Sequence, residues 1–420
     1  MKSKFRVVII GGGLSGLSAA HTLLDRGCRD FVLLERNAVP GGRVRTVEKD
    51  GFRLDLGFQV GLSSYPAFRR ILPLRLLEPR FFGAGALVEE QPGEIRCLAH
   101  PLRHPSKISN GIFSKLPLAD RARLVKQAVE CIFRDDQSLL EPTGQTALTW
   151  LKQKGFTDAM IDSFFRPFFG GVFLDNELET DASLLRYYLK KFIIGRAFVP
   201  RGGMGEMSQR LADEIPIGKI RYRTEVGTIT HTDDGVLISL EEGGERITAG
   251  KVIIATDPGA LAKLSGWGDP PEFRPTKVIY YRSDERLYQG PWIVLPSKGN
   301  GIVQHFVQMT NVDPSLAPKG QSLLSATVLD DRGLDDEMLA AEVKKDIARL
   351  FPEAETLLET LCIIPVPAAL PVQDPEAISG YRQHTFGEGI FPAGDLVSNA
   401  SLQNALQSGR DAALKVLDRY

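Results

Sequence analysis

The clearest pattern of apolar and polar positions lies at the start of the chain. An apolar run over residues 5–10 is followed by glycine-rich residues 11–16, a helix-like segment over residues 17–24 and a second apolar run over residues 31–34. Short apolar runs bounded by turn residues are typical of buried strands, and the segment between them has helical spacing. The pattern therefore predicts two parallel strands joined by a helix.

Similar patterns further along the chain predict short strands and aromatic helices. Short apolar runs recur over residues 220–226, 235–240 and 251–255, which predicts a group of strands. Residues 161–175 and 184–198 concentrate aromatic side chains beside glycines. These two segments are compatible with buried core helices, with the wall of a pocket for a large apolar molecule, or with a basic, aromatic face that contacts a membrane.

The glycines of the first turn have the spacing of a dinucleotide-binding site. Gly11 permits a tight turn after the strand, Gly13 lets a pyrophosphate approach the backbone, and Gly16 lets the helix pack closely on the sheet. The first helical turn offers free N–H groups to phosphate. Glu35 follows the second strand, where a carboxylate accepts hydrogen bonds from ribose hydroxyls. The candidate cofactor-binding residues of this region are Gly11, Gly13, Leu14, Ser15, Gly16, Glu35 and Arg36.

Two further glycine motifs lie far apart in the chain. Residues 41–43 pair two glycines, which expose backbone N–H groups, with an arginine that supplies a donor fork for phosphate. Near the other end, a Gly-Asp pair precedes a helical segment whose expected N-cap is Ser401. That helix would direct the positive end of its dipole toward a bound group. The candidate residues of these motifs are Gly41, Gly42, Arg43, Gly394, Asp395, Ser401 and Leu402.

The order of these motifs resembles the flavin-containing amine oxidase superfamily, which includes monoamine and polyamine oxidases, protoporphyrinogen oxidases and phytoene desaturases. The resemblance implies that residues 41–43 lie along the diphosphate of FAD and that Asp395 binds its ribityl or diphosphate part. It also implies that the helix after Ser401 faces the flavin C2 carbonyl, and that Val226 binds adenine through its backbone. The aromatic segments are more similar to the desaturase and protoporphyrinogen oxidase branch than to the amine oxidases proper.

The resemblance implies an α/β fold with a Rossmann-type FAD-binding domain built from three separated segments. We expect this domain over residues 1–78, 196–268 and 385–420, and an α+β substrate-binding domain over residues 79–195 and 269–384. Such a layout places the flavin at a domain interface, where small-molecule sites are common. The chain has one dinucleotide turn and not two, so we expect electrons to arrive from the substrate and not from NAD(P)H.

Composition agrees with a soluble enzyme. A formal net charge of −1, with charged residues at 25%, gives no field that would attract nucleic acid. The four scattered cysteines and six histidines show no metal-ligand spacing, so we expect no metal and no disulfide framework. The first apolar run is too short for a signal peptide, and no run reaches the ~20 apolar residues of a membrane span. We therefore expect a cytoplasmic protein, with peripheral membrane contact left open.

Three residues of the expected second domain are considered. Lys277 lies in a segment that resembles the strand on which amine oxidases carry a lysine bonded through water to flavin N5, so it is the candidate catalytic residue. The alternative is an ordinary exposed lysine. His305 and His384 are in the same domain and could approach the pocket, but each is more often a satisfied polar residue than a base. Residues 397–404 contain no aromatic side chain, although amine oxidases place part of an aromatic cage there, which argues against a small-amine site.

These observations predict a flavoenzyme that removes a hydride equivalent from a CH–CH or CH–NH unit of a mainly apolar small molecule. FAD is expected to bind noncovalently, because no cysteine lies in the C-terminal segment. Oxygen or a quinone would reoxidise the flavin. The alternatives are a true amine oxidase, a flavin-binding protein without turnover and an NAD-binding regulatory protein.

Overall fold

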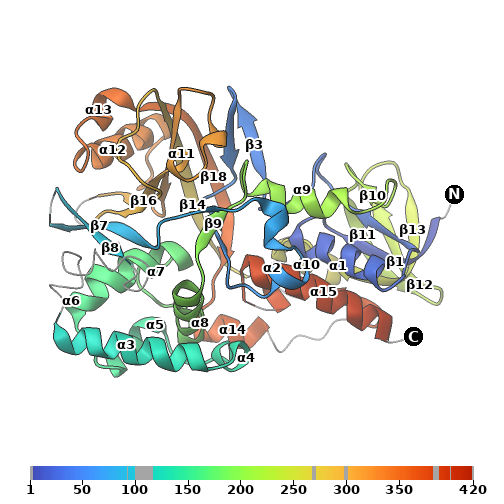
Figure 1. Cartoon of the computed structure of the whole chain (residues 1–420). Helices are drawn as coiled ribbons and strands as arrows, with labels where there is room; N and C mark the ends of the chain where they lie inside the picture. Colours follow the sequence, from blue (N-terminus) through green and yellow to red (C-terminus); the bar gives the residue numbers. More distant parts are fainter. Residues whose placement is uncertain are drawn as a thin grey trace.

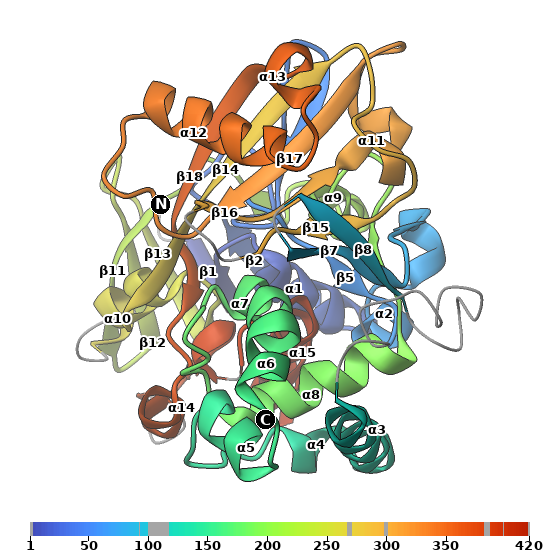
Figure 2. The same ribbon diagram turned by 90° about the vertical axis from the view of Figure 1, so that its left-hand side faces the viewer.

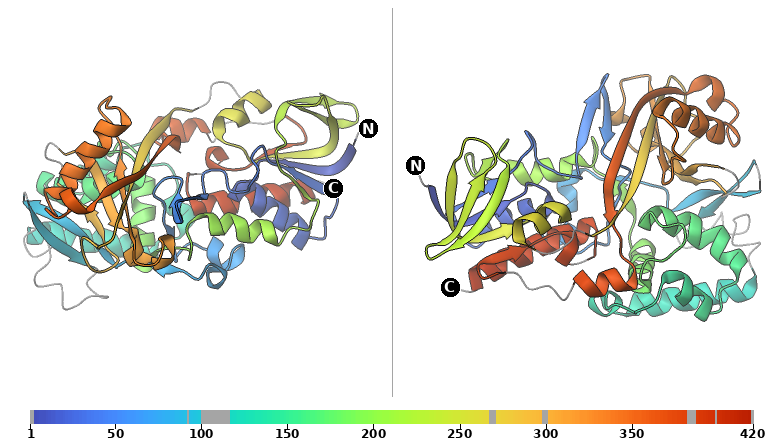
Figure 3. Two further views of the ribbon diagram at one scale, coloured as in Figure 1. Left: turned by 90° about the horizontal axis from the view of Figure 1, so that it is seen from above. Right: turned by 180° about the vertical axis from the view of Figure 1, so that it is seen from behind.

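The computed structural model describes residues 3–91, 93–99, 117–266, 271–297, 301–381, 387–397 and 399–418. Two seven-stranded sheets occupy opposite sides of the molecule, and a layer of helices lies beneath the second sheet (Figure 1). The two sheets are also separate when the molecule is seen from behind (Figure 3). The fold is a mixed α/β architecture, as predicted.

The first sheet is built around the predicted strand–helix–strand unit. Strands β1 (Ser3–Ile10) and β2 (Phe31–Leu34) pair in parallel and are joined by helix α1 (Leu14–Asp25). Strand β13 (Arg246–Ile254) pairs in parallel with β1. On the other side of β13, its first half pairs antiparallel with β12, and its end pairs in parallel with β19. The remaining members of this sheet are β10 (Ile220–Arg221), β11 (Val226–Thr232), β12 (Gly235–Leu240) and β19 (Ile390–Pro392).

The strands of this sheet come from residues 3–34, 220–254 and 390–392, which fall within the three segments expected for the cofactor domain. Helices α1, α9 (Gly205–Asp213) and α15 (Leu402–Asp418) cover one face, and α10 (Pro258–Ser265) covers part of the other. Because both faces are covered at the centre of the sheet, β1 and β2 contain continuous apolar runs instead of alternating ones. Val7, Val8 and Ile9 accordingly have no exposed surface.

Helix α15 packs directly on helix α1, which brings the two ends of the sequence together. A β-carbon on Gly409 would lie 1.9 Å from the carbonyl oxygen of Ser15, so only glycine allows this approach. The Ser18 hydroxyl donates a hydrogen bond to the carbonyl of Leu406, 2.6 Å away. This contact places the C-terminal glycine motif next to the N-terminal one.

The second sheet has the strand order β18–β14–β17–β16–β15–β7–β8 and is antiparallel except for the pair β15–β7. Its strands are β7 (Gly85–Gln91), β8 (Glu94–Ala99), β14 (Phe273–Ser283), β15 (Ile293–Leu295), β16 (Val303–Gln308), β17 (Ser322–Val328) and β18 (Glu359–Pro371). Helices α12 (Asp336–Ala348) and α13 (Ala354–Leu357) cover its outer face (Figure 2). Side chains alternate between the faces: Ile279 and Tyr281 pack under these helices, whereas Val278 and Tyr280 face the interior.

A layer of helices lies below the second sheet (Figure 2). It contains α3 (Leu118–Phe133), α4 (Asp136–Leu139), α5 (Ala147–Gln153), α6 (Asp158–Met160), α7 (Arg166–Phe173) and α8 (Ala182–Ile194), with a π-helical turn (Ile161–Phe165) between α6 and α7. Side-chain caps fix where several of these helices begin: Thr146 caps α5 and Asp181 caps α8. Phe165, Phe169 and Phe173 are spaced by four residues, are buried, and stack on one another.

Smaller elements connect these layers. Strands β3 (Thr46–Lys49) and β4 (Phe52–Asp55) form a hairpin, and β5 (Gly61–Leu62), β9 (Ala197–Val199) and β6 (Arg80–Phe81) form a three-stranded sheet. Short helices are α2 (Ala67–Arg70), α11 (Met309–Val312) and α14 (Pro375–Tyr381). Within the described residues, no helix combines the length and the apolar character needed to cross a membrane.

Candidate cofactor and substrate site

The turn after β1 requires glycine at two positions and is open at a third. Gly11 has a φ of +103°, and a β-carbon there would lie 2.5 Å from the carbonyl oxygen of Ala255. A β-carbon on Gly16 would lie 1.8 Å from the carbonyl oxygen of Gly11, whereas one on Gly13 would meet nothing closer than 4.0 Å. Gly16 thus lets the helix pack on its own turn, and Gly13 leaves space for a phosphate group.

Helix α1 begins without a side-chain cap. Its N-cap is Gly13, and no side chain in the described structure accepts a hydrogen bond there. The first N–H groups of a helix need acceptors, and an anion at the N-terminus supplies them. The residues present therefore fit the diphosphate of a dinucleotide, which the turn from Gly11 to Gly16, including Leu14 and Ser15, would hold.

Glu35 lies at the end of β2 with its carboxylate fixed beside this turn. Its Oε2 atom accepts a hydrogen bond from the Gly12 N–H at 2.6 Å, and Oε1 accepts two from Asn37 at 2.7 Å. The side chain is therefore held where a ribose hydroxyl would meet it. The neighbouring Arg36 is exposed, with its guanidinium 3.8 Å from the carboxylate of Asp257.

The predicted adenine residue, Val226, lies near the same edge of the sheet. The Thr224 N–H donates to the Glu35 carbonyl at 2.9 Å, and Val226 begins strand β11 two residues later. The mid-chain segment thus runs beside the end of β2. Binding of adenine by the Val226 backbone stays a prediction.

The second glycine turn lies directly beside the first. The Gly41 N–H donates to the Gly12 carbonyl at 2.9 Å, and Gly41 and Gly42 both have positive φ, +122° and +57°. Arg43 follows and forms an ion pair with Asp395. The Asp395 carboxylate is the main reason why the pKa of Arg43 is raised. The fold therefore joins the N-terminal and C-terminal motifs in one charged cluster.

The C-terminal motif has the predicted cap. The Ser401 hydroxyl accepts a hydrogen bond from the Asn404 N–H at 3.1 Å, and the Gly394 N–H donates to the Ser408 hydroxyl at 2.9 Å. Ser401 and Leu402 line a cavity, so the positive end of the α15 dipole is adjacent to it.

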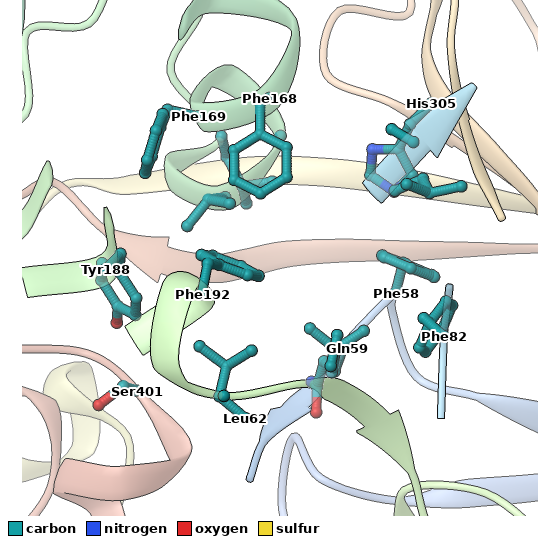
Figure 4. A pocket seen from close by; sticks show the side chains of 18 of the residues that line it. Phe58, Gln59, Leu62, Phe82, Phe168, Phe169, Tyr188, Phe192, His305 and Ser401 are labelled. Atoms are coloured by element: carbon teal, nitrogen blue, oxygen red, sulfur yellow. The ribbon is translucent and has the colours of Figure 1, made fainter. Parts of the chain in front are cut away.

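This cavity has a volume of about 830 Å³ and lies between the second sheet and the helical layer, reaching the N-terminus of α15. Helices α7 and α8 supply aromatic side chains to one wall, and residues before and after β5 and β6 supply others (Figure 4). The aromatic side chains in the lining include Phe58, Phe82, Phe164, Phe168, Phe169, Tyr188 and Phe192. The aromatic segments of the sequence therefore contribute both to the core and to the cavity wall.

Charged groups are few in this lining. Among the described residues they are Arg43, Arg121, Arg196 and Asp395. Asp395 is the single carboxylate among them, and it is already paired with Arg43. The described lining therefore offers no carboxylate that is available as a general base.

The structure places Lys277 away from the cavity. The Lys277 ammonium lies 2.9 Å from Asp331 and 3.3 Å from Asp336, on the α12 side of the second sheet. Its neighbour Thr276 lines the cavity, because adjacent side chains of a strand point to opposite faces. Lys277 is therefore not positioned for chemistry in this cavity, and the expectation of a lysine beside the flavin is not supported.

His305 lines the cavity instead, whereas His384 lies outside the described residues. The His305 side chain is 4% exposed, and its ring lies 4.6 Å from the ring of Phe58. Its Nε2 atom has no hydrogen-bond partner in the described structure, so the residue is not the satisfied polar group expected from the sequence. Burial lowers its pKa to about 3, which keeps the imidazole uncharged.

Sequence reasoning also missed Tyr188, which lies next to the cap of α15 (Figure 4). The Tyr188 hydroxyl donates to the Ala400 carbonyl at 3.1 Å, and Ser401 and Tyr65 are also within hydrogen-bonding reach. Its pKa is raised to about 12, chiefly by burial. An aromatic side chain thus does reach this end of the cavity, but it comes from α8 and not from residues 397–404.

The chain is similar to proteins of known activity and of known structure. The chain is 21% identical over 457 residues to the 15-cis-phytoene desaturase, chloroplastic/chromoplastic, of Narcissus pseudonarcissus, which covers 99% of this chain and 80% of that protein. It is 22% identical over 387 residues to the coproporphyrinogen III oxidase of Bacillus subtilis (strain 168), covering 77% of each. The solved structure of cyclohexylamine oxidase from Brevibacterium oxydans IH-35A has the same fold, with a TM-score of 0.73 at 17% identity over 99% of both chains.

Fold, glycine turns and cavity together are those of an FAD-dependent oxidoreductase. The chain belongs to the flavin containing amine oxidoreductase family, whose model matches residues 14–417. The predicted superfamily is therefore confirmed, and so is its desaturase-like and porphyrinogen oxidase-like character.

Proposed function

We propose that this enzyme removes a hydride equivalent from a CH–CH or CH–NH unit of a large, mainly apolar small molecule. The observation that carries the proposal is the aromatic cavity of about 830 Å³ that begins at Arg43, Asp395 and Ser401. Pockets of this size and character bury most of a ligand's surface. When bound, FAD supplies the hydride acceptor, while the protein supplies orientation and electrostatics.

Several residues of the chain would contribute directly to that chemistry. The α15 N-terminus, capped by Ser401, puts a fixed partial positive charge beside the cavity, which stabilises negative charge that develops there. Phe164, Phe168 and Phe192 exclude water from the substrate side. Since the described lining lacks an available carboxylate, loss of a hydride without a separate protein base is the simplest reaction for this site.

We further propose that FAD is held noncovalently and that oxygen or a quinone reoxidises it. Noncovalent binding is supported by the described lining of the cavity, which contains no cysteine. The named activities of the relatives, a phytoene desaturase and a coproporphyrinogen III oxidase, support an apolar polyene or a reduced tetrapyrrole as the type of substrate. A true amine oxidase is the alternative, because a cyclohexylamine oxidase shares the fold.

The test begins with the purified protein. We expect flavin absorbance bands, FAD in the supernatant after acid precipitation, and anaerobic bleaching by a polyene or porphyrinogen panel. Bleaching by amines alone would establish the alternative. A protein that takes up FAD but is bleached by neither panel would contradict turnover and favour a flavin-binding protein without it.

We also propose that the enzyme contacts a membrane surface through helix α3, which runs along the edge of the helical layer (Figure 1). This helix departs from an ordinary surface helix, whose exposed side is polar. Its interior side carries Asp120, Gln127 and Cys131, which are buried, and Leu124, which packs on the core, whereas its outer side carries large exposed apolar residues beside the exposed Glu130. These outer residues are Leu118, Val125, Val129 and Phe133.

Position and charge both favour a lipid surface as the partner of this apolar side of α3. Val125 is 62% exposed and also lines the cavity, so the apolar surface of the helix continues into the apolar cavity. Lys126, midway along α3, and Arg134, its C-terminal cap, are exposed and would meet anionic headgroups, although Glu130 is exposed on the same helix. An apolar substrate dissolved in a bilayer would then enter the cavity beside the helix that contacts the membrane.

A further inference from the structure

The cavity has two unlike walls. Helices α7 and α8 present aromatic side chains, whereas the second sheet presents His305 from β16 and Thr327 from β17. These two residues are directly opposite each other across the antiparallel pair β16–β17. Thr327 is 2% exposed, so both side chains lie in the protein interior at the cavity surface.

Both polar side chains lack partners. In the described structure, His305 Nε2 and Thr327 Oγ1 form no hydrogen bond. A third polar residue of the same wall behaves differently, because the Thr276 hydroxyl donates to the Val328 carbonyl at 2.9 Å. Leaving a buried polar group unpaired costs about 1–3 kcal/mol. Two such groups side by side at a cavity surface therefore indicate that a ligand completes them.

We infer that the His305–Thr327 pair binds a neutral hydrogen-bonding group of the substrate, a hydroxyl, carbonyl or N–H, while the apolar body lies against the phenylalanine wall. This inference rests on the proposed function and specifies its substrate class. It favours an amphiphilic molecule, with an apolar body and a polar group at one position, over a pure hydrocarbon.

The character of His305 explains why the recognised group is neutral. Its ring packs on Phe58 and against the backbone of Gly171, where an added β-carbon would lie 3.1 Å from Nδ1. In this setting the imidazole stays uncharged, so it offers one donor and one acceptor nitrogen but no ion pair to a carboxylate. Figure 4 shows His305 on the opposite side of the view from Tyr188 and Ser401. The polar pair is thus separate from the cofactor end.

Two probes that differ by one hydroxyl test the inference: naphthalene and 2-naphthol, bound to the FAD-loaded enzyme in equilibrium dialysis. We expect 2-naphthol to bind about tenfold more tightly than naphthalene, as one added hydrogen bond allows. Thr327→Val, which keeps the side-chain shape, and His305→Leu should each bring this ratio close to one. Their affinity for naphthalene should stay within about twofold.

Phe168→Leu is the matched control, because it changes the aromatic wall and leaves the polar pair intact. It should weaken both probes by the same factor and preserve the ratio. Equal affinity of the wild type for the two probes, no binding of either, or an unchanged ratio in both polar variants would overturn the inference. The assay needs no turnover, so an enzyme that shows the expected ratios but oxidises no panel substrate would contradict the proposed function alone.

Discussion

Arg43 and Asp395 form an ion pair although 352 residues separate them in the sequence. The side chain of Asp395 is almost buried, and Arg43 is also half-buried. Charge-assisted hydrogen bonds of this kind are stronger than neutral ones. The pair therefore connects the second glycine turn to the start of the C-terminal motif, at the cofactor end of the cavity.

We expect Asp395→Asn to weaken FAD binding. The Asp395 carboxylate is predicted to accept a hydrogen bond from the ribityl part of FAD, and losing a hydrogen bond to a charged group costs about 1.5–3 kcal/mol, or at least tenfold in affinity. The measurement is the FAD-to-protein ratio after dialysis, together with the dissociation constant from quenching of flavin fluorescence. Arg282→Gln, which breaks the exposed pair with Glu359, is the control and should retain FAD fully.

Lys277→Met should leave flavin reoxidation by oxygen unchanged. The ammonium is held by Asp331 and Asp336 on the face of β14 that points away from the cavity. Breaking these partly exposed pairs should change the free energy of unfolding by less than about 1 kcal/mol. Stopped-flow mixing of the reduced enzyme with oxygen gives the rate. A clear slowing in the variant would restore the lysine as a candidate.

Lys277 and Thr276 lie on opposite faces of β14, and this difference shows what could not be predicted from the sequence. The resemblance identified the correct strand, but a shift of one residue exchanges its two faces, and the face depends on pairing with β17 and β18. The glycine turns and the Ser401 cap could be predicted because their geometry is set within a few residues. The pairing of His305 with Thr327 and the place of Tyr188 beside the α15 cap could not, because each depends on contacts between distant segments.

The first sheet, which is built from three segments of the chain, could be predicted only in part. Its central strands are buried on both faces, so their apolar runs were visible in the sequence, but their order was not. The exposed apolar side of α3 shows a further limit of prediction from the sequence. Apolar spacing predicts that one face of a helix is apolar, but it does not show whether that face packs inward or outward.

Asp55→Asn should stabilise the protein increasingly as pH rises. The Asp55 carboxylate is buried and accepts hydrogen bonds from Thr46 at 2.6 Å and from the Met204 N–H at 2.8 Å. Burial raises its pKa from 3.8 to about 6. The folded state therefore holds this proton more tightly than the unfolded state, and this residue's contribution to stability is lost as pH rises from about 4 to 6.

Asparagine keeps an acceptor oxygen and cannot ionise. The variant should gain up to about 3 kcal/mol relative to the wild type above pH 6, and little below pH 4. Urea unfolding of both proteins across this range provides the measurement. A difference between them that stays constant with pH would show that folding does not raise the pKa of Asp55.

The apolar side of α3 leads to the last prediction. Val125 and Val129 are one helical turn apart and exposed, so replacing both with aspartate should be tolerated by the fold while removing apolar contact with lipid. Burial of each valine side chain is worth about 1.5–3 kcal/mol, so vesicle affinity should fall at least about tenfold. The measurement is co-flotation with vesicles of phosphatidylcholine and phosphatidylglycerol, beside unchanged flavin content.

Ile217→Asp provides the matched control, because Ile217 is a fully exposed apolar residue between α9 and β10, outside helix α3. This variant should bind vesicles as the wild type does. That result would show that the effect of the double variant comes from the surface of α3 and not from a general loss of exposed apolar area. Omitting phosphatidylglycerol should weaken wild-type binding if Lys126 and Arg134 contact headgroups. The competing explanation is that the apolar side of α3 is a contact between copies of the chain, and sedimentation velocity tests it. A changed oligomeric state of the double variant, with no vesicle binding by any of the proteins, would establish that explanation and overturn the membrane proposal.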